Sequence, residues 1–208
     1  MPEVAEARVA GDETVRARLL AAAIGLFARK GFAATTVREI VEEAGVTKPA
    51  LYYYFGSKEG IFQEMMRGAL STFEATVADV LKMKGSASRR VLSFIDSVHA
   101  LVLAHLDVMR VVDSLYYGPS QGAPSFDFEV VHTRFMETLT GLVREGMEKG
   151  EFRPGDAQDV AWALVGPFEV ARGMSLCHPE MDFGRERLAR LVRVVLKGIS
   201  ATYTEECE

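Results

Sequence analysis

Residues 47–58, which read TKPALYYYFGSK, hold the densest cluster of side chains suited to contacting a charged polymer. Tyr52, Tyr53 and Tyr54 stand between two lysines and are followed by Phe55. A helix turns about 100° per residue, so only one or two of four consecutive rings can face a core. An outward tyrosine offers an apolar ring for a sugar or a thymine methyl group and a hydroxyl for a phosphate oxygen. Lysines on either side supply the positive charge that phosphate contacts require.

The residue types that most often perform catalysis or bind metals are scattered along the chain. His99 and His105 are six residues apart and fall on different faces of a helix, while His132 and His178 stand alone. The sequence contains no HExxH, HxH or P-loop motif, and no GxGxxG after a strand. We therefore expect no catalytic residues, no metal site and no cofactor, and hence no enzyme.

Composition indicates an ordinary folded protein of the cytoplasm. The chain has 208 residues, 49% of them hydrophobic and 25% charged, and no apolar run approaches the roughly 18 residues of a membrane span. The acidic start, MPEVAEARVAGDE, lacks the apolar core of a secretory signal and is expected to be a short loose tail. Cys177 and Cys207 fit no CxxC spacing, so reduced thiols are expected. A net charge of −5 argues against a protein coated in basic residues but allows a local basic patch.

Apolar residues recur with the 3.6-residue period of a helix in nearly every segment, and no segment alternates as a strand does. The sequence therefore predicts an all-α fold of about nine helices. Gly31 ends the first, Thr36 and Glu39 form a capping box for the second, and Thr47 can cap the third. The expected helices span about 15–30, 36–44, 47–56, 57–84, 87–106, 107–117, 126–149, 156–177 and 183–203, with loops at 118–125 and 151–155.

The second and third helices, joined by a turn at Gly45-Val46, match a helix-turn-helix arrangement packed on a preceding longer helix. Leu51 and Phe55 share one face, with Tyr54 at its edge, and are expected to pack on the second helix and Val46. That leaves Thr47, Lys48, Tyr52 and Tyr53 pointing outward. Residues 14–60 hold seven basic and four acidic residues, so this segment carries +3 in an acidic chain.

Residues 35–59 read TTVREIVEEAGVTKPALYYYFGSKE, and this order of capping box, glycine turn and aromatic run resembles the TetR family of bacterial transcriptional regulators. The match covers about residues 13–60. The resemblance implies a DNA-binding domain over 13–60 and an effector-binding and dimerisation domain over 61–208. It also implies contacts with a double-stranded DNA operator. Those to phosphate come from Thr36, Tyr53 and Lys58, those to bases or the groove from Thr47, Lys48, Pro49 and Tyr52, and Arg38 and Tyr54 are further candidates.

The second half of the chain holds candidates for a small-molecule pocket, since such pockets are mostly apolar with a few polar groups. For each candidate, a place in the plain helical core is an equally good interpretation. Tyr116 and Tyr117, next to the 118–125 loop, are the preferred edge of the pocket. The full set of candidates is Phe94, His99, Met109, Tyr116, Tyr117, Phe135, Met136, Trp162 and Phe168.

The segments 156–177 and 183–203 are apolar over more than one face. In the TetR family the corresponding helices pair with those of a second copy, so the resemblance implies a homodimer, and two recognition helices suit a near-palindromic site. We therefore predict a homodimeric repressor that an unknown small-molecule effector releases from a palindromic operator, with no membrane partner. Two alternatives stay open: a small-molecule-binding helical protein without DNA-binding activity, and a helical enzyme, which would need a polar cluster not visible in the sequence.

Overall fold

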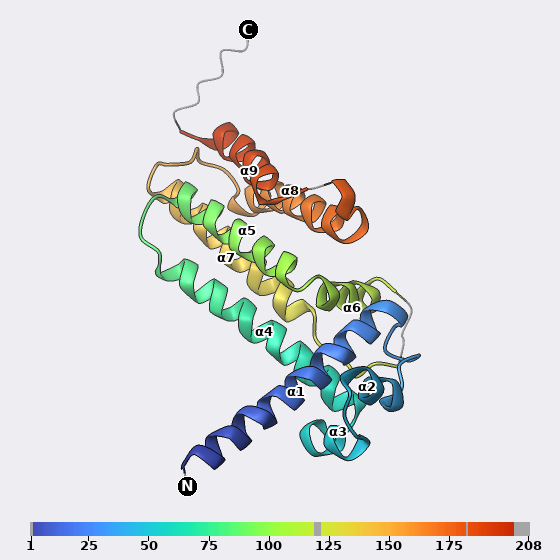
Figure 1. Cartoon of the computed structure of the whole chain (residues 1–208). Helices are drawn as coiled ribbons and strands as arrows, with labels where there is room; N and C mark the ends of the chain where they lie inside the picture. Colours follow the sequence, from blue (N-terminus) through green and yellow to red (C-terminus); the bar gives the residue numbers. More distant parts are fainter. Residues whose placement is uncertain (1, 119–121, 182, 202–208) are drawn as a thin grey trace. The chain divides into compact units, whose positions relative to one another are not determined.

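The computed structural model describes residues 2–118, 122–181 and 183–201, with side chains from residue 14 onward. Within these residues it has nine α-helices, one 3₁₀ helix, η1 (Pro179–Met181), and no strand beyond a single bridge between Phe152 and Ser200 (Figure 1). The predicted all-α fold is confirmed. Residues 119–121 of the predicted 118–125 loop lie outside the described residues. So do the last residues of the predicted 183–203 helix and Cys207.

The chain divides into two compact units. The first comprises Met1–Leu70 and Asp107–Phe126, and the second Ser71–Leu106 and Asp127–Glu208. The helix α4 (Lys58–Lys82) runs from the first unit into the second. The units therefore differ in extent from the domains expected at 13–60 and 61–208, which remain predictions about function.

The first unit is built around a small aromatic core. Its ring centroids lie 5.2 Å apart for Phe27 and Phe32, and 5.4 Å apart for Phe32 and Phe62. Leu19 and Leu51 are fully buried, so the third helix is anchored to the first through apolar contact. The first unit contains five helices or parts of helices. They are α1 (Pro2–Lys30), α2 (Val37–Ala44), α3 (Lys48–Phe55), the start of α4, and α6 (Leu106–Tyr116) apart from its first residue.

The prediction of a loose N-terminal tail is wrong, because α1 begins at Pro2. Residues 2–14 hold three alanines and three glutamates, which have high helix propensity. Proline is well tolerated in the first turn of a helix, where its missing N–H would have no helical partner. Local propensity therefore extends the helix about three turns beyond the apolar stripe that begins at Val15.

The second unit is a stack of four helices in which α5 packs against α7, α8 and α9, and α8 packs against both α7 and α9 (Figure 1). The inner face of α5 follows the helical period, with Val91, Phe94, Ile95 and Val98 all buried. Each helix lies within a few residues of its predicted range. The bounds are α5 (Ala87–Ala104), α7 (Glu129–Glu148), α8 (Ala157–Cys177) and α9 (Arg185–Ile199).

The connector after α7 ties three helices together, a role that the sequence did not predict. The Glu151 carboxylate accepts a hydrogen bond from the backbone N–H of Ala87 at 2.7 Å and so closes the start of α5. Phe152 is fully buried, and a Cβ atom at Gly146 would overlap its ring. The backbone N–H of Arg153 donates to the carbonyl of Ile199 at 2.8 Å. The connector thus fixes the ends of α5, α7 and α9.

Candidate nucleic-acid interface

The helix α2 has defined ends, as the sequence predicted. The Thr36 hydroxyl accepts a hydrogen bond from the backbone N–H of Glu39 at 3.3 Å, and the Glu39 carboxylate accepts one from the backbone N–H of Thr36 at 2.9 Å. The Lys30 ammonium, followed by the two Thr36 donors, lowers the pKa of Glu39 from 4.5 to about 2. Gly45 ends the helix with φ 61° and ψ 42°, a left-handed conformation that glycine adopts without strain.

Two cations hold the turns that flank α2. The Lys58 ammonium donates to the carbonyls of Phe32 and Thr35, both at 2.9 Å, and lies 4.2 Å from the centroid of the Phe32 ring. The Arg18 guanidinium donates to backbone carbonyls at the end of α2, at 2.9 Å for Gly45. Charge-assisted hydrogen bonds of this kind are stronger than neutral ones. Lys58 is therefore engaged inside the first unit in the structure described, while its role as a phosphate contact stays a prediction.

The helix α3 buries one face and exposes the other, as predicted. Leu51 is fully buried, and Tyr54 and Phe55 are half-buried. By contrast, Tyr52 is 52% exposed and Tyr53 is 77% exposed. The exposed face also carries Thr47, Lys48 and Pro49. Five of the residues expected to contact DNA thus lie close together at the start and outer side of one helix.

The start of α3 lacks a side-chain cap. Thr47 occupies the N-cap position with φ −97° and ψ 156°, but its hydroxyl makes no capping hydrogen bond, contrary to the expectation that it would. The first backbone N–H groups of a helix have no partner within the helix and carry partial positive charge. An uncapped helix start with an exposed hydroxyl beside it is suited to receiving hydrogen-bond acceptors such as phosphate oxygens.

Most of the positive charge of residues 14–60 is paired within the chain. Four cations form ion pairs: Arg16 with Glu64, Arg29 with Glu43, Lys30 with Glu39, and Arg38 with Glu42. Arg18 and Lys58 bind carbonyls, as described above. Of the seven cations, only Lys48 makes no hydrogen bond or ion pair with any described residue. The positive charge that remains available therefore lies at Lys48, beside the uncapped end of α3.

Three other predicted DNA contacts already interact with neighbouring residues. The Thr36 hydroxyl belongs to the capping box. The Arg38 Nε atom lies 2.7 Å from the Glu42 carboxylate, and this hydrogen bond raises the pKa of Arg38. The Tyr54 ring meets the Tyr53 ring edge-on, with centroids 4.9 Å apart. Exposure thus favours Thr47, Lys48, Pro49, Tyr52 and Tyr53.

Four of the predicted pocket residues come together inside the second unit. The ring centroids of Phe94 and Phe135 are 5.0 Å apart, and those of Phe135 and Phe168 are 5.1 Å apart. His99 meets Phe168 edge-on at 6.4 Å. All four side chains are buried. They form one aromatic cluster contributed by α5, α7 and α8.

The other predicted pocket residues lie elsewhere. Trp162 is 49% exposed and contacts His132, with ring centroids 5.9 Å apart. Met136 is half-buried on α7. Met109, Tyr116 and Tyr117 belong to the first unit, where the two exposed tyrosine rings meet each other at 4.8 Å. The nine candidates thus do not form one pocket within either unit, because three of them belong to the first unit and Trp162 is half-exposed on α8.

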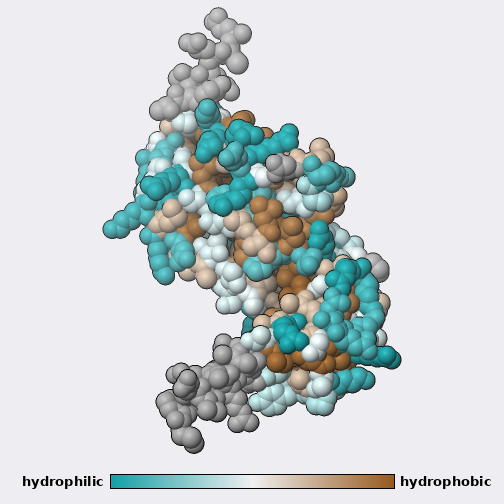
Figure 2. Space-filling model, in the orientation of Figure 1, coloured by the Kyte–Doolittle hydropathy of each residue, from teal (hydrophilic) through white to brown (hydrophobic). Residues whose placement is uncertain are grey.

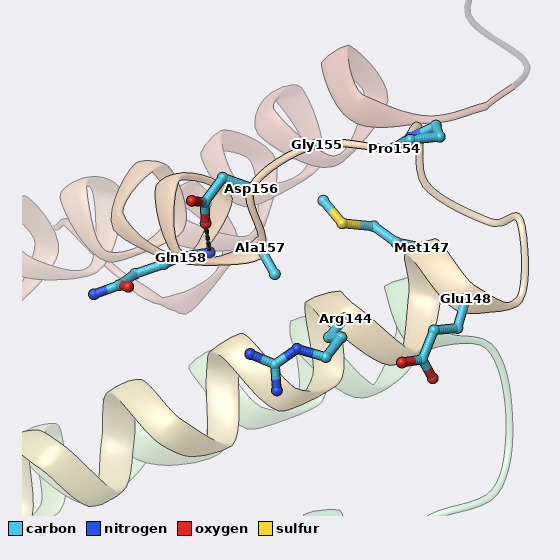
Figure 3. A pocket seen from close by; sticks show the side chains of 8 residues that line it. All are labelled: Arg144, Met147, Glu148, Pro154, Gly155, Asp156, Ala157 and Gln158. Atoms are coloured by element: carbon cyan, nitrogen blue, oxygen red, sulfur yellow. Dashed lines mark hydrogen bonds between the residues drawn. The ribbon is translucent and has the colours of Figure 1, made fainter.

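Two grooves were not predicted. One, of about 560 Å³, lies at the junction of α7 and α8, where Met147 points toward the Pro154-Gly155 loop and the Asp156 carboxylate caps α8 through the Gln158 N–H (Figure 3). The other, of about 550 Å³, lies where α5 ends and α9 begins. It is lined by Leu103, Gly184, Arg185, Glu186, Arg187 and Arg190.

The described part of the chain offers no metal site and no single membrane-spanning helix. No group of three or more histidine, cysteine, aspartate or glutamate side chains within it is placed to hold a metal ion. None of its helices is by itself both long and apolar enough to cross a membrane. The pair α5 and α6 would pass that test together by length and composition alone.

Comparison with known proteins gives four likenesses. The sequence model of bacterial regulatory proteins of the tetR family matches residues 19–65. The HTH-type transcriptional repressor KstR2 of Mycobacterium tuberculosis is 31% identical over 161 residues, which cover 76% of this chain and 80% of that one. The fatty acid metabolism regulator protein of Bacillus subtilis is 25% identical over 138 residues, which cover 66% and 71%. The solved structure of M. tuberculosis KstR2 superposes with a TM-score of 0.70 at 24% identity, covering 89% of this chain and 94% of that one.

Proposed function

Since this chain belongs to the TetR family of bacterial regulatory proteins, we propose that it is a homodimeric transcriptional repressor that a small-molecule effector releases from DNA. Two copies place two α3 helices on a palindromic operator in the cytoplasm, and effector binding lowers their affinity for it. The M. tuberculosis relative is named as a transcriptional repressor, which supports this direction of control. We assign the chain regulation of transcription and no enzymatic step.

The exposed face of α3 is the observation that carries the proposal. Its tyrosine hydroxyls, the Thr47 hydroxyl and the Lys48 ammonium point outward, and Lys48 is unpaired among the described residues. Phosphate oxygens accept hydrogen bonds from such groups, while the tyrosine rings and Pro49 offer apolar contact to thymine methyl groups and sugars. A helix of this kind fits the major groove.

Dimer formation is supported by exposed apolar side chains on α8 and α9. Trp162 and Val170 of α8 are 49% and 53% exposed, and Leu191 and Val194 of α9 are 38% and 68% exposed. The spacing is i, i+8 on α8 and i, i+3 on α9, so each pair lies along one side of its helix. Figure 2 shows brown, hydrophobic patches between teal, hydrophilic ones on the face in view. Pairing with a second copy would remove them from water.

The helix α4 supports a route from effector to DNA, because it belongs to both units. Lys58, at its first residue, is bonded to the carbonyls that precede α2. A change in the position of α4 would therefore displace the turn that precedes α2 and so shift α2 and α3. The effector needs only to bind one arrangement of α4 more tightly than the other, and this difference in affinity limits the size of the response.

The first test is selection of operators from random duplex DNA by the full chain, followed by fluorescence-anisotropy titration of the selected site. If the Tyr53 hydroxyl contacts phosphate, Tyr53→Phe should weaken binding to selected and random DNA by a similar factor of a few. Tyr117→Phe, which alters an exposed tyrosine outside α3, is the matched control and should bind as the wild type does. Failure to select any sequence would favour the alternative, a ligand-binding protein without DNA-binding activity.

A further inference from the structure

His99 is a buried polar side chain without a partner. It is fully inaccessible to solvent, and neither ring nitrogen has a hydrogen-bond partner among the described residues. Buried polar groups in folded proteins are nearly always hydrogen-bonded, so such an exception calls for a physical explanation. Burial is also the main reason why the pKa of His99 is lowered, which keeps the ring neutral, with one N–H donor and one acceptor nitrogen. The backbone of Ala171 opposes this shift without reaching hydrogen-bond geometry.

The surroundings of His99 on its inner side are aromatic. Phe94, Phe135 and Phe168 form a continuous stack, and His99 meets its last ring edge-on. These phenylalanine rings have no donor or acceptor atom that could form a hydrogen bond in the plane of the imidazole. They do offer a surface on which an apolar chain or ring system can lie once the stack opens.

The positively charged groove at the start of α9 lies beside His99. Asp96, His99 and Leu103 are spaced three and four residues apart, so they share one face of α5. The Arg185 Nε atom donates to the Asp96 carboxylate at 2.9 Å, which places the start of α9 against that face. Leu103 and Arg185 are also walls of the groove of about 550 Å³. Its lining holds Glu186 and three arginines, of which Arg185 is paired with Asp96 while Arg187 and Arg190 form no ion pair with any described residue. An anion entering this groove would reach the turn of α5 that carries His99.

We infer that the effector is an acidic amphiphile, an apolar body with a carboxylate or phosphate head, whose head is hydrogen-bonded by His99 and whose body lies among Phe94, Phe135 and Phe168. The neutral imidazole donates its N–H to the head group, and Arg187 and Arg190 of the groove balance the negative charge. The Phe135 and Phe168 rings are in contact in the structure described, so the ligand must separate them. Bound and free forms therefore differ, which a ligand-induced population shift requires.

This inference rests on the proposed function only in calling the ligand an effector. Binding of the ligand probes and binding of DNA are therefore measured separately. The probes are decanoate, decyl phosphate, methyl decanoate and decylamine, which share one alkyl chain and differ in head group. Binding to the full chain is measured by calorimetry, and the imidazole ¹⁵N signals of the four histidines are followed by NMR. We expect the two anions to bind and to shift the His99 signal, with the ester and the amine at least tenfold weaker.

His99→Leu separates a ligand anchor from a structural residue. Removing an unsatisfied buried polar group should raise the melting temperature of the free protein while weakening binding of the anion at least tenfold. His99→Gln, which keeps a donor and an acceptor, should retain part of the binding. His105→Leu, at the exposed end of the same helix, is the matched control and should resemble the wild type in both measurements.

The outcomes are distinct. A preference for decanoate over decyl phosphate, or the reverse, identifies the head group. Equal binding of decanoate by wild type and His99→Leu overturns the inference, and so does a lower melting temperature of His99→Leu with unchanged affinity. If decanoate binds at His99 but the chain selects no DNA, the proposed function fails while the binding site stands. If the chain binds an operator but none of the four probes, the inference fails while the proposed function stands.

Discussion

The exposed face of α3 and the cluster around His99 both hold polar groups that no other described residue satisfies, but one faces water and the other does not. Water can hydrogen-bond the Thr47 hydroxyl and the Lys48 ammonium, so leaving them unpaired costs little. The imidazole of His99 has no such substitute, and an unsatisfied buried polar group costs about 1–3 kcal/mol. The difference suits different partners: a large, rigid polyanion for the surface, and a small molecule that enters the interior for the cluster.

The two regions also differ in how the chain assembles them. The α3 face is drawn from seven consecutive positions, 47–53, on one helix and its cap. The His99 cluster takes side chains from α5, α7 and α8, separated by up to 74 residues in sequence (Phe94 to Phe168). A local surface keeps its geometry if one helix forms. A cluster from three helices changes whenever their packing changes, which makes it suited to sensing.

Disrupting the proposed dimer should have the largest effect on DNA binding, because each α3 helix then binds DNA without that of a second copy. Replacing Val170 and Val194 together by aspartate should give monomers in sedimentation experiments, since it places charge in the proposed interface. Affinity for a full palindromic site should fall by about 100-fold or more, because linked binding of two modules typically gains at least that factor. Affinity for a half-site should be unchanged.

Val130→Asp is the control for this experiment. Val130 is 45% exposed on α7, so it tests the same kind of substitution at a similar degree of exposure outside the proposed interface, with one added negative charge per chain instead of two. It should leave both the sedimentation coefficient and DNA affinity unaltered. If the double variant is still a dimer, α8 and α9 do not form the dimer interface.

A smaller effect distinguishes Lys48 from Lys58, the two lysines that flank the aromatic run. Lys48→Met should weaken binding to all DNA sequences by roughly tenfold, lower the salt-dependence slope by about one, and leave stability unchanged. Lys58→Met should leave the slope unchanged. It should lower stability by about 1–3 kcal/mol, because two half-buried carbonyls lose their donor.

Salt titrations by fluorescence anisotropy and urea denaturation of the full chain make both measurements. The two variants should be compared at temperatures where each is folded. A reduced salt slope for Lys58→Met would show that its ammonium leaves Phe32 and Thr35 to contact phosphate, as the family resemblance implied.

Lys48 and Lys58 also show what the sequence can and cannot reveal. The capping box at Thr36, the turn at Gly45 and the outward face of α3 were predictable because each depends on residues within about four positions. The acceptors of Lys58 lie 26 and 23 residues away, and nothing in the local pattern marks them. Position in the motif indicated that Lys58 mattered, but only the fold shows what it contacts.

The pocket was harder to predict for the same reason. The expectation of a mostly apolar pocket selected Phe94, Phe135 and Phe168, which are buried, and also Trp162, which is half-exposed. Helical period gives a face, but whether a second helix covers that face depends on long-range packing. The lack of a partner for His99 has no counterpart in the sequence at all.

The smallest predicted effect concerns pH and tests whether the α2 cap helps to hold the recognition face. The pKa of Glu39 is lowered from 4.5 to about 2, first by Lys30 and then by Thr36. A carboxylate with a depressed pKa stabilises the fold above pH 4.5, and this contribution is lost as pH falls through 2. Amide-exchange protection of α2 in the full chain should therefore fall across that window more steeply in the wild type than in Glu39→Gln.

Two variants show whether this dependence comes from the cap. Glu43→Gln alters an exposed carboxylate that pairs with Arg29 and takes no part in the capping box, so it should follow the wild type. Lys30→Met removes the main cause of the depressed pKa and should move the loss of protection to higher pH. If Glu39→Gln instead tracks the wild type across the window, the capping box does not govern local opening of α2. The position of α3 would then depend on Arg18, Lys58 and the buried Leu51 rather than on the helix preceding it.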